Sequence, residues 1–349
     1  MAGYFFKKLL YGLLIYYSVA TIVFFIFSFS FPSPDELATG QRSDEKTKEA
    51  IKKEFGLDKP IKTQYLYYIN DVSFVSVYKD LKEINVSKIQ LISLGGNKIV
   101  LKIPYLRRSF QTGKQVNTII KEAFTGTLIL AVSSILLATI AGVFLGCLAA
   151  VKKDTWVDRL ILFISTTGIS LPSFFVAIIL AWLLGFVLSK YTGLNMTGNY
   201  NDLDPFRGEI FVLKNLILPT LALGIRPLSI FSQLTRASVL DVLPRDYIRT
   251  AKAKGLSKTK IVTKHVLRNS LIPVVTSISG WFASLLTGTF FVEFIFNWKG
   301  LGKITVDALD NSDLPLVMGA VIVVALIFVF VNIAVDILYS ILDPRVTLE

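Results

Sequence analysis

Cysteine and histidine are almost missing from this chain of 349 residues. It contains one cysteine, Cys147, and one histidine, His265. A single cysteine excludes a disulfide framework, and its place in an apolar run argues against a thiol-based metal site. A single histidine excludes a site built from several histidine ligands. The protein is therefore expected to have neither a disulfide framework nor a metal site built from several histidines.

Charge is also scarce. Only 18% of the residues are charged and 53% are hydrophobic, and the mean hydropathy is +0.59. A soluble globular domain carries about 25% charged residues, so this composition indicates that lipid forms part of the solvent. The net charge of +12 admits two interpretations, a membrane protein with a basic cytoplasmic side or a nucleic-acid binder, and the placement of the charges decides between them.

Long uncharged runs predict an all-α polytopic membrane protein with six transmembrane helices. A helix crosses the hydrocarbon core with about 20 apolar residues. Five runs meet this requirement without charge, and a sixth contains only Lys214 and Arg226. The six runs are Leu9–Phe31, Phe124–Val151, Leu160–Ser189, Phe211–Thr235, Ser270–Val292 and Leu314–Val335.

Basic residues predict the orientation. Lys and Arg concentrate in the segment 236–268 and recur at Lys152, Lys153 and Arg159, whereas the short loops on the other side hold few. The excess of Lys and Arg marks the cytoplasmic side, so both termini of this multi-pass protein are expected in the cytoplasm. Because the basic residues lie beside the spans, nucleic-acid binding is not expected.

The loop 32–122 is the one long hydrophilic segment and is expected outside the cell. Residues Asp44–Phe55 predict an amphipathic helix stopped by Gly56. Residues Lys88–Ile103 alternate between apolar and polar around Gly95-Gly96-Asn97, which predicts a hairpin. The sequence therefore predicts a small extracytoplasmic α+β insertion between helices one and two, preceded by the N-terminal span 1–31 and followed by a five-helix core over 123–349.

The segment 246–273 is the most informative. Residues Asp246–Lys254 predict a short helix, Gly255 suits a left-handed cap, and Ser257 can cap a second helix that runs into the next span. Small residues, Ala251 and Ala253, stand among basic ones. The pattern favours a helix-turn-helix that docks into a groove on a partner, and ordinary positive-inside charge is the competing interpretation.

This segment resembles the coupling motif of ABC importer permeases. The residues 250–252, Thr-Ala-Lys, stand at the EAA position and Gly255 at the motif's glycine, and the variant RTAxAKG with H-x-LRN-x-L-x-P is similar to the dipeptide/oligopeptide and nickel permease branch. The resemblance extends over nearly the whole chain. Further matching pieces are Gly56–Pro60 with Gln64–Leu66, Trp156–Arg159, Ser170–Phe174, Leu234–Ser238, Val292-Glu293, Gly300–Gly302 and Asp343–Arg345. Three features depart from it: an insertion at 73–104, Lys299 in place of proline, and Arg226 within a span.

The resemblance implies half of an ATP-driven importer for peptides or similar small solutes, located in a bacterial plasma (inner) membrane. It implies a second homologous permease, two cytoplasmic ATPase subunits and an extracytoplasmic solute-binding protein as partners in the lipid bilayer. The chain lacks a G-x-x-x-x-G-K-[ST] loop, so it is not expected to be an enzyme or to bind a cofactor, and ATP and Mg are expected on the ATPase subunits. The residues expected to couple to the ATPase are Arg249, Thr250, Ala251, Lys252, Ala253, Lys254, Gly255 and His265.

Candidates for the substrate pathway come from polar and helix-breaking residues in or near the spans: Arg226, Ser170, Pro172, Ser173 and Glu293. Arg226 could bind an anionic group of the solute or form a structural ion pair. Glu293 stands near the end of a span, where solvation at the membrane interface is the simpler expectation. The sequence holds no HExxH and no paired intramembrane acids, which argues against an intramembrane enzyme. A passive channel or a loop-anchored receptor stays open as an alternative function.

Overall fold

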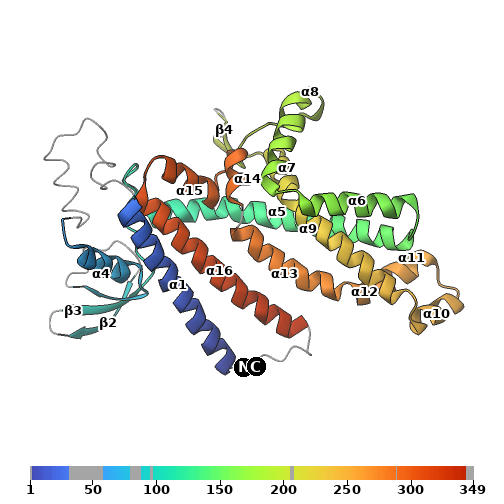
Figure 1. Ribbon diagram of the computed structural model, residues 1–349, viewed down its shortest axis with the longest axis horizontal. Coiled ribbons are helices and arrows are strands. Elements are labelled where there is room, and N and C mark those ends of the chain that lie inside the picture. The colour runs from blue at the N-terminus through green and yellow to red at the C-terminus, as the bar shows by residue number, and fades with distance from the viewer. Residues whose placement is uncertain are drawn as a thin grey trace. The chain divides into compact units, whose positions relative to one another are not determined.

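The computed structural model describes residues 2–30, 58–78, 88–94, 97–204, 208–287 and 289–342 (Figure 1). It divides into two compact units. Unit 1 comprises Met1–Phe124 and Ile304–Val329, and unit 2 comprises Thr125–Lys303 and Phe330–Glu349. The predicted helix over 44–55, the Gly95-Gly96 turn and the segment 343–345 lie outside the described residues. The predicted domain boundaries after residues 31 and 122 stay predictions.

The described chain is mostly helical, with two small sheets. Its long helices are α1 (Ala2–Ser30), α5 (Val116–Val151), α9 (Leu213–Val242) and α16 (Leu314–Leu342). Shorter helices are α4 (Ile61–Val72), α6 (Trp156–Ser170), α7 (Ser173–Leu180), η3 (Ala181–Val187), α8 (Ser189–Thr192), α10 (Asp246–Ala253), α11 (Lys258–Lys260), η4 (Ile261–Val266), α12 (Leu267–Ser270), α13 (Ile272–Thr287), α14 (Phe290–Ile295) and α15 (Leu301–Asp310). The strands are β1 (Val75–Tyr78), β2 (Lys88–Leu94), β3 (Asn97–Lys102), β4 (Asn201–Asp204) and β5 (Gly208–Phe211).

Among the described residues, four helices are long and apolar enough to cross a membrane, and up to six spans result if each of two bent helix pairs counts as one. The third predicted run, over 160–189, is not one straight helix. Its two halves, α6 and α7 with η3, meet at 108°. Pro172 explains the break, because proline lacks an amide hydrogen and disfavours helical backbone in the residue before it. Leu171 accordingly has extended dihedrals, φ −80° and ψ 132°.

Unit 1 combines α1 with α4 and a three-stranded antiparallel sheet of order β1-β3-β2. Strand β1 is an addition that the alternation in the sequence does not reveal. The Tyr16 hydroxyl donates to the carbonyl oxygen of Val72 at 2.6 Å, and the Phe24 ring lies 5.2 Å from the Tyr68 ring. These contacts pack α4 along α1, which fixes the start of the sheet relative to that helix.

Unit 2 is organised around α9, which contacts α6, α7 and α13 (Figure 1). Its contact with α5 depends on two glycines spaced four residues apart, Gly142 and Gly146. A Cβ on Gly142 would lie 2.7 Å from the Leu228 carbonyl oxygen and 2.9 Å from the Phe231 Cβ, and a Cβ on Gly146 would collide with the Ser232 carbonyl. This spacing places both glycines on one helix face, and it lets the two backbones approach as small residues do in membrane helices.

We expect Gly146→Leu to destabilise the protein by at least ~1–3 kcal/mol, the usual range for overpacking, because the new side chain would push α5 away from α9. Thermal unfolding of the detergent-purified chain measures the effect. Phe144→Leu is the matched control, since Phe144 is exposed on the same helix and should melt as the unsubstituted chain does. Equal melting of both variants would contradict the role assigned to the glycine contact.

Candidate functional site

The helix α10 ends in a rigid turn centred on Gly255. Gly255 has φ +76°, its amide donates to the Lys252 carbonyl at 3.0 Å, and the Leu256 amide donates to the Ala251 carbonyl at 3.3 Å. These two bonds form a Schellman motif, which caps a helix through a left-handed residue. The left-handed cap predicted for Gly255 is therefore present.

The second helix of the segment starts where Ser257 stands. The Ser257 hydroxyl accepts from the Lys260 amide at 3.4 Å, the bond of an N-cap. The chain then continues through α11, the π-helical η4 and α12, and bends by 56° into α13. Asn269 on α12 donates to the Tyr247 hydroxyl on α10 at 3.0 Å, which closes the hairpin. We call the segment 246–270 the coupling element.

Apolar packing fixes the coupling element to the membrane helices of unit 2. Ile248 and Ala251 lie on the inner face of α10 and are buried. They belong to one cluster of buried residues: Ala150, Val239, Val242, Ile248, Ala251, Ile261 and Val266. Ala251 is expected to pack against the ATPase, but its side chain is buried within unit 2, because this residue stands three positions after Ile248 and shares its inward face. The exposed small residue is Ala253.

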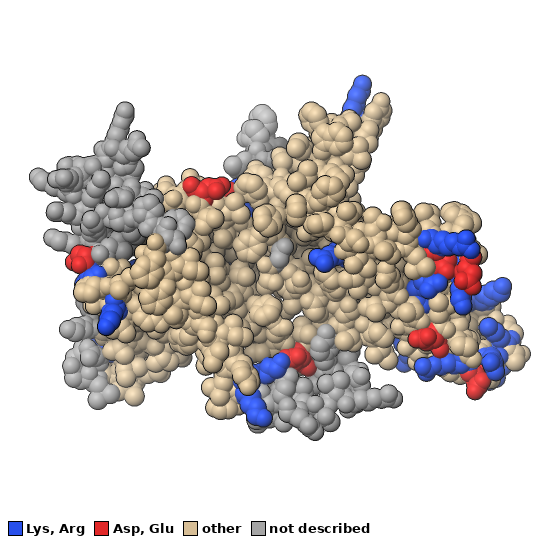
Figure 2. Space-filling view, in the orientation of Figure 1, with Lys and Arg blue, Asp and Glu red and all other residues tan. Residues whose placement is uncertain are grey.

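The outer surface of the coupling element is basic. Arg249, Thr250, Lys252, Lys254 and Gly255 are exposed, and His265 is half-buried. Figure 2 shows the blue side chains gathered at the end of unit 2 that α10 and α11 form. Arg249 pairs with Asp246 at 3.6 Å, and both side chains are solvent-exposed, so this pair contributes at most about 0–1 kcal/mol. The positive charges therefore remain available to a partner.

An ion pair between half-buried Arg236 and buried Asp158 connects α9 to α6 near the coupling element. Arg236 donates from Nε and Nη2 to the two carboxylate oxygens of Asp158, both at 2.7 Å, and the Asp154 amide donates to Asp158 at 3.0 Å. Two parallel bonds fix the guanidinium relative to the carboxylate. The sequence gives Asp158 and Arg236 as charges at span ends, but nothing in their spacing shows that they pair.

Polar side chains form an exposed surface where α6, α9 and α13 are adjacent. Arg226 on α9 is exposed, and its guanidinium carbon lies 5.8 Å from the centre of the Trp281 ring on α13. Gln233, two turns further along α9, donates to Thr166 on α6 at 3.5 Å. We call these residues with Ser170 the polar surface. An exposed cation in a candidate span requires a protein partner or a water-filled cavity, because lipid solvates it poorly.

The residues at the break between α6 and α7 lie at the surface. Ser170 and Pro172 are exposed and Ser173 is half-buried. The Ser170 hydroxyl donates to the Thr166 carbonyl at 2.9 Å. Ser170 shares α6 with Thr166 and lies one turn from it, so the break extends the polar surface. The structure thus brings Arg226 and Ser170 onto adjacent helices.

Glu293 occupies a different environment from the one expected. Its side chain is fully buried, so it neither meets water at the interface nor lines the polar surface. One carboxylate oxygen accepts from the hydroxyls of Thr127 at 2.7 Å and Thr289 at 2.8 Å. The other accepts from the amides of Gly302 at 2.7 Å and Lys303 at 3.3 Å. This corrects the predicted pathway position of Glu293, because four donors enclose the carboxylate inside the fold.

The loop before α15 wraps around this carboxylate. A Cβ on Gly300 or Gly302 would collide with the Glu293 carboxylate, which explains both glycines. Trp298 donates from its ring nitrogen to the Gly126 carbonyl at 2.9 Å. The backbone amide of Lys299 donates to Asn199 at 3.1 Å, a bond that proline at this position could not make. The described residues contain no group of three or more His, Cys, Asp and Glu that could hold a metal ion.

Comparison with known proteins gives matches over nearly the whole chain. The family described as binding-protein-dependent transport system inner membrane component matches residues 142–348. The family described as the N-terminal part of the membrane component of the same transport systems matches residues 1–131. The two matched segments together contain α1, the sheet of unit 1, the polar surface and the coupling element.

Curated relatives include permeases from several bacteria. The dipeptide transport system permease protein DppB of Haemophilus influenzae is 39% identical over 255 residues, covering 68% of this chain and 75% of that protein. The glutathione transport system permease protein GsiC of Escherichia coli O6:H1 is 34% identical over 347 residues, covering 99% of both chains. Among solved structures, an inward-facing MetNI methionine ABC transporter matches with a TM-score of 0.46 and 15% identity, covering 65% of this chain and 97% of that one.

For the buried carboxylate we expect Glu293→Gln to keep most of the stability and Glu293→Leu to lose several kcal/mol. The glutamine amide can still accept from the Gly302 and Lys303 amides and donate to the two hydroxyls. Leucine would leave those amides without acceptors, at ~1–3 kcal/mol for each orphaned group. Thermal unfolding of the two purified variants checks this ranking. A Leu variant as stable as the Gln variant would show that the hydrogen bonds of Glu293 do not hold the loop.

Proposed function

Because the chain belongs to the family of binding-protein-dependent transport system inner membrane components, we propose that its coupling element transmits ATPase movements to the polar surface. The chain is the permease subunit of an ABC importer. It spans the membrane and supplies part of the translocation pathway. The coupling element and the polar surface both lie within the matched segment 142–348.

One observation carries the coupling proposal: the coupling element is rigid and continuous with the membrane helices. Its Schellman turn and N-cap fix the hairpin internally, and its buried cluster joins α10 to α9 through Val239 and Val242. A force on α10 therefore reaches α9, which carries Arg226, without an intervening flexible loop. The outer face offers Ala253, Gly255 and basic side chains, so a groove with acidic or carbonyl groups suits it.

The partners of the chain are inferred from this arrangement. Two cytoplasmic ATPase subunits bind ATP with Mg, one of them against the coupling element. A second homologous permease, identical or different, completes the pathway opposite the polar surface, and an extracytoplasmic solute-binding protein delivers the solute. The concentration of Lys and Arg in the coupling element supports a cytoplasmic position for it. If each bent pair is one span, the proposed topology has six spans, both termini in the cytoplasm and the α4 and β1–β3 region outside.

Gly255 offers a test of coupling. We expect Gly255→Val to abolish solute-stimulated ATP hydrolysis and uptake, while Gly255→Asn retains a large part of both. A Cβ at Gly255 would meet nothing within 4 Å, so a larger side chain causes no collision. The effect of a substitution therefore depends on whether the new residue tolerates the positive φ of this position. A left-handed conformation costs about 1–2 kcal/mol in an ordinary L-residue, whereas asparagine adopts it more readily.

The measurement uses the permease co-purified with its ATPase subunits and reconstituted into vesicles. Membrane amounts of both variants are quantified first, which separates loss of coupling from loss of protein. Unaltered ATPase binding, stimulation and uptake in Gly255→Val would show that the basic residues of the coupling element only orient the protein in the membrane.

The solute we propose is a peptide with a free carboxylate, drawn towards Arg226. The relatives DppB and GsiC both transport peptides by their names, and peptide carboxylates are the group that a guanidinium binds in a bidentate manner. The Trp281 ring supports the cation from one side. Arg226 is exposed, so its remaining donors can face the pathway between the two permeases.

We expect Arg226→Gln to slow uptake of a free-carboxylate dipeptide about tenfold or more, because a hydrogen bond to a charged group contributes ~1.5–3 kcal/mol and 1.4 kcal/mol is tenfold. Uptake of the same dipeptide with an amidated C-terminus should change little. Both peptides are supplied at saturation of the binding protein, and uptake into vesicles is measured for wild type, Arg226→Lys and Arg226→Gln. Equal slowing of both peptides, or failure of the Gln variant to assemble, would assign Arg226 a structural role.

A further inference from the structure

One face of the three-stranded sheet of unit 1 carries apolar side chains from all three strands. The strand register aligns two cross-strand rows of side chains on it. These rows are Val75–Leu101–Ile89 and Val77–Ile99–Ile92. Ile99 is half-buried, and the other five are 42% to 65% exposed. We call these six residues the open sheet face. A contiguous apolar patch of this kind marks an interaction surface.

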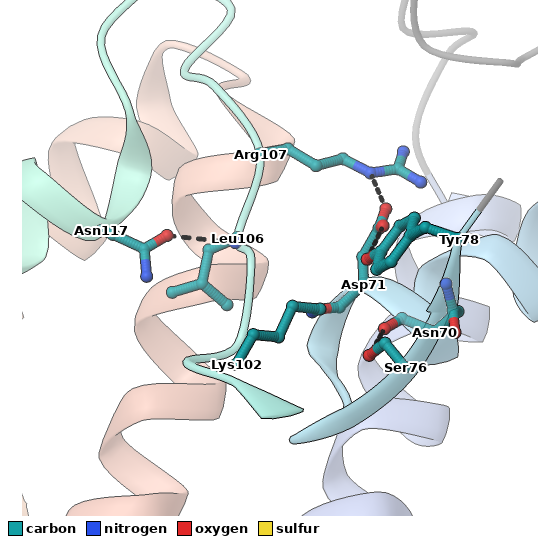
Figure 3. Close-up of polar contacts among 8 residues, drawn as sticks. All are labelled: Asn70, Asp71, Ser76, Tyr78, Lys102, Leu106, Arg107 and Asn117. Atoms are coloured by element: carbon teal, nitrogen blue, oxygen red, sulfur yellow. Dashed lines mark hydrogen bonds and ion pairs between the residues drawn. The ribbon is translucent and has the colours of Figure 1, made fainter. Parts of the chain in front are cut away.

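On β1 and β3 the opposite face of the sheet is buried and holds polar groups, whereas Gln90 on β2 is exposed on that face. Ser76, Val100 and Lys102 are buried there. Figure 3 shows Lys102, Tyr78 and Arg107 converging on Asp71 at the end of α4. Arg107 pairs with the Asp71 carboxylate at 3.1 Å, Tyr78 donates to it at 3.1 Å, and the Lys102 ammonium donates to the Asp71 carbonyl. Burial lowers the pKa of Lys102 to about 8. The charges of this region are thus satisfied internally, away from the open sheet face.

One free edge of the sheet is also closed. The side-chain amide of Asn70 donates to the Val77 carbonyl at 3.0 Å, and the Val77 amide donates to the Asn70 side-chain oxygen at 2.9 Å. Asn70 therefore satisfies both outward backbone groups of Val77 on the outer strand β1. Water can solvate the free backbone groups of an edge strand, whereas backbone groups next to lipid require a protein partner.

The sheet begins alongside a membrane helix. Tyr16 and Tyr17 bond Val72 and Ser73, and β1 starts two residues later. Both tyrosines lie within the candidate span Phe6–Phe29, more than three turns before its end. The 29 residues of α1 extend about 43 Å, against about 30 Å of hydrocarbon, so part of α1 reaches the headgroup region. The sheet consequently lies beside α1 and not beyond its end.

We propose that the open sheet face rests on the lipid leaflet that surrounds the C-terminal half of α1, at the boundary between headgroups and acyl chains. Exposed residues of that half, among them Ile22, Ile26 and Phe29, are apolar and provide a lipid-facing surface beside the sheet. The boundary level fits because headgroups and water can still reach the outer edge of β2. The sheet thus adds a membrane-surface anchor to the spanning helices.

Lipid contact is measured with a fluorescent NBD label on single cysteines in a Cys147→Ser background. Leu101→Cys and Ile89→Cys report on the open sheet face. Gln90→Cys is the matched control, because Gln90 is exposed on β2 and pairs with Val100 on the other face. The full chain is reconstituted into phosphatidylcholine vesicles with or without lipid carrying a doxyl quencher near the headgroup. Labels at 101 and 89 should lose most of their emission to this quencher, and the label at 90 should instead be quenched by aqueous iodide.

The same labels are then read in the complete transporter with its binding protein. Persistent doxyl quenching supports the lipid contact. Iodide quenching at both 101 and 89 would overturn it, since the face would then be in water. Loss of doxyl quenching on assembly would overturn it as well, because a protein partner would then cover the face. If Leu101→Cys perturbs the sheet, Ile89 on the outer strand decides the result.

Discussion

The close approach of α5 and α9 through Gly142 and Gly146 is the contact on which unit 2 depends. Lipid gives helices little hydrophobic reason to associate, because acyl chains are as apolar as leucine. Association then relies on packing and on polar contacts, and both require that the backbones come near. The two glycines provide this, since no side chain separates α5 from the carbonyls of Leu228 and Ser232. With α9 held against α5, the helices α6, α7 and α13 have a fixed partner.

Helix α9 connects the polar surface to the coupling element. Its middle carries Arg226 beside Trp281, and its end carries Arg236, which is held by Asp158. Beyond Val242 the chain enters α10, whose Ile248 and Ala251 pack back onto α9. Because a packed core is stiff, displacement of α10 is transmitted to α9. A permease that couples ATP hydrolysis to movement of its pathway needs this kind of connection.

Polar groups that lie away from water explain several other features. Glu293 has no cationic partner among its hydrogen-bond donors, and two hydroxyls and two amides enclose its carboxylate instead. Asp71 collects Arg107, Tyr78 and Lys102 in unit 1. In both places the penalty of burying a charge is offset locally by hydrogen bonds. These networks determine where glycine is required and where the loops must close.

The sequence alone determined the membrane class, the apolar runs, the basic segment and the helix-turn-helix over 246–270. These properties follow from local composition and from residues a few positions apart. Gly255 and Ser257, for example, cap helices through hydrogen bonds with residues three positions away in the chain. Only the tertiary structure decided that Ala251 faces inward, that Glu293 is enclosed, that Asp158 meets Arg236, and that the run over 160–189 bends at Pro172 by 108°. The reason is distance along the chain. The partners of Glu293 and Asp158 lie up to 166 and 78 residues away, and no periodicity in the sequence records which distant residues will be brought together.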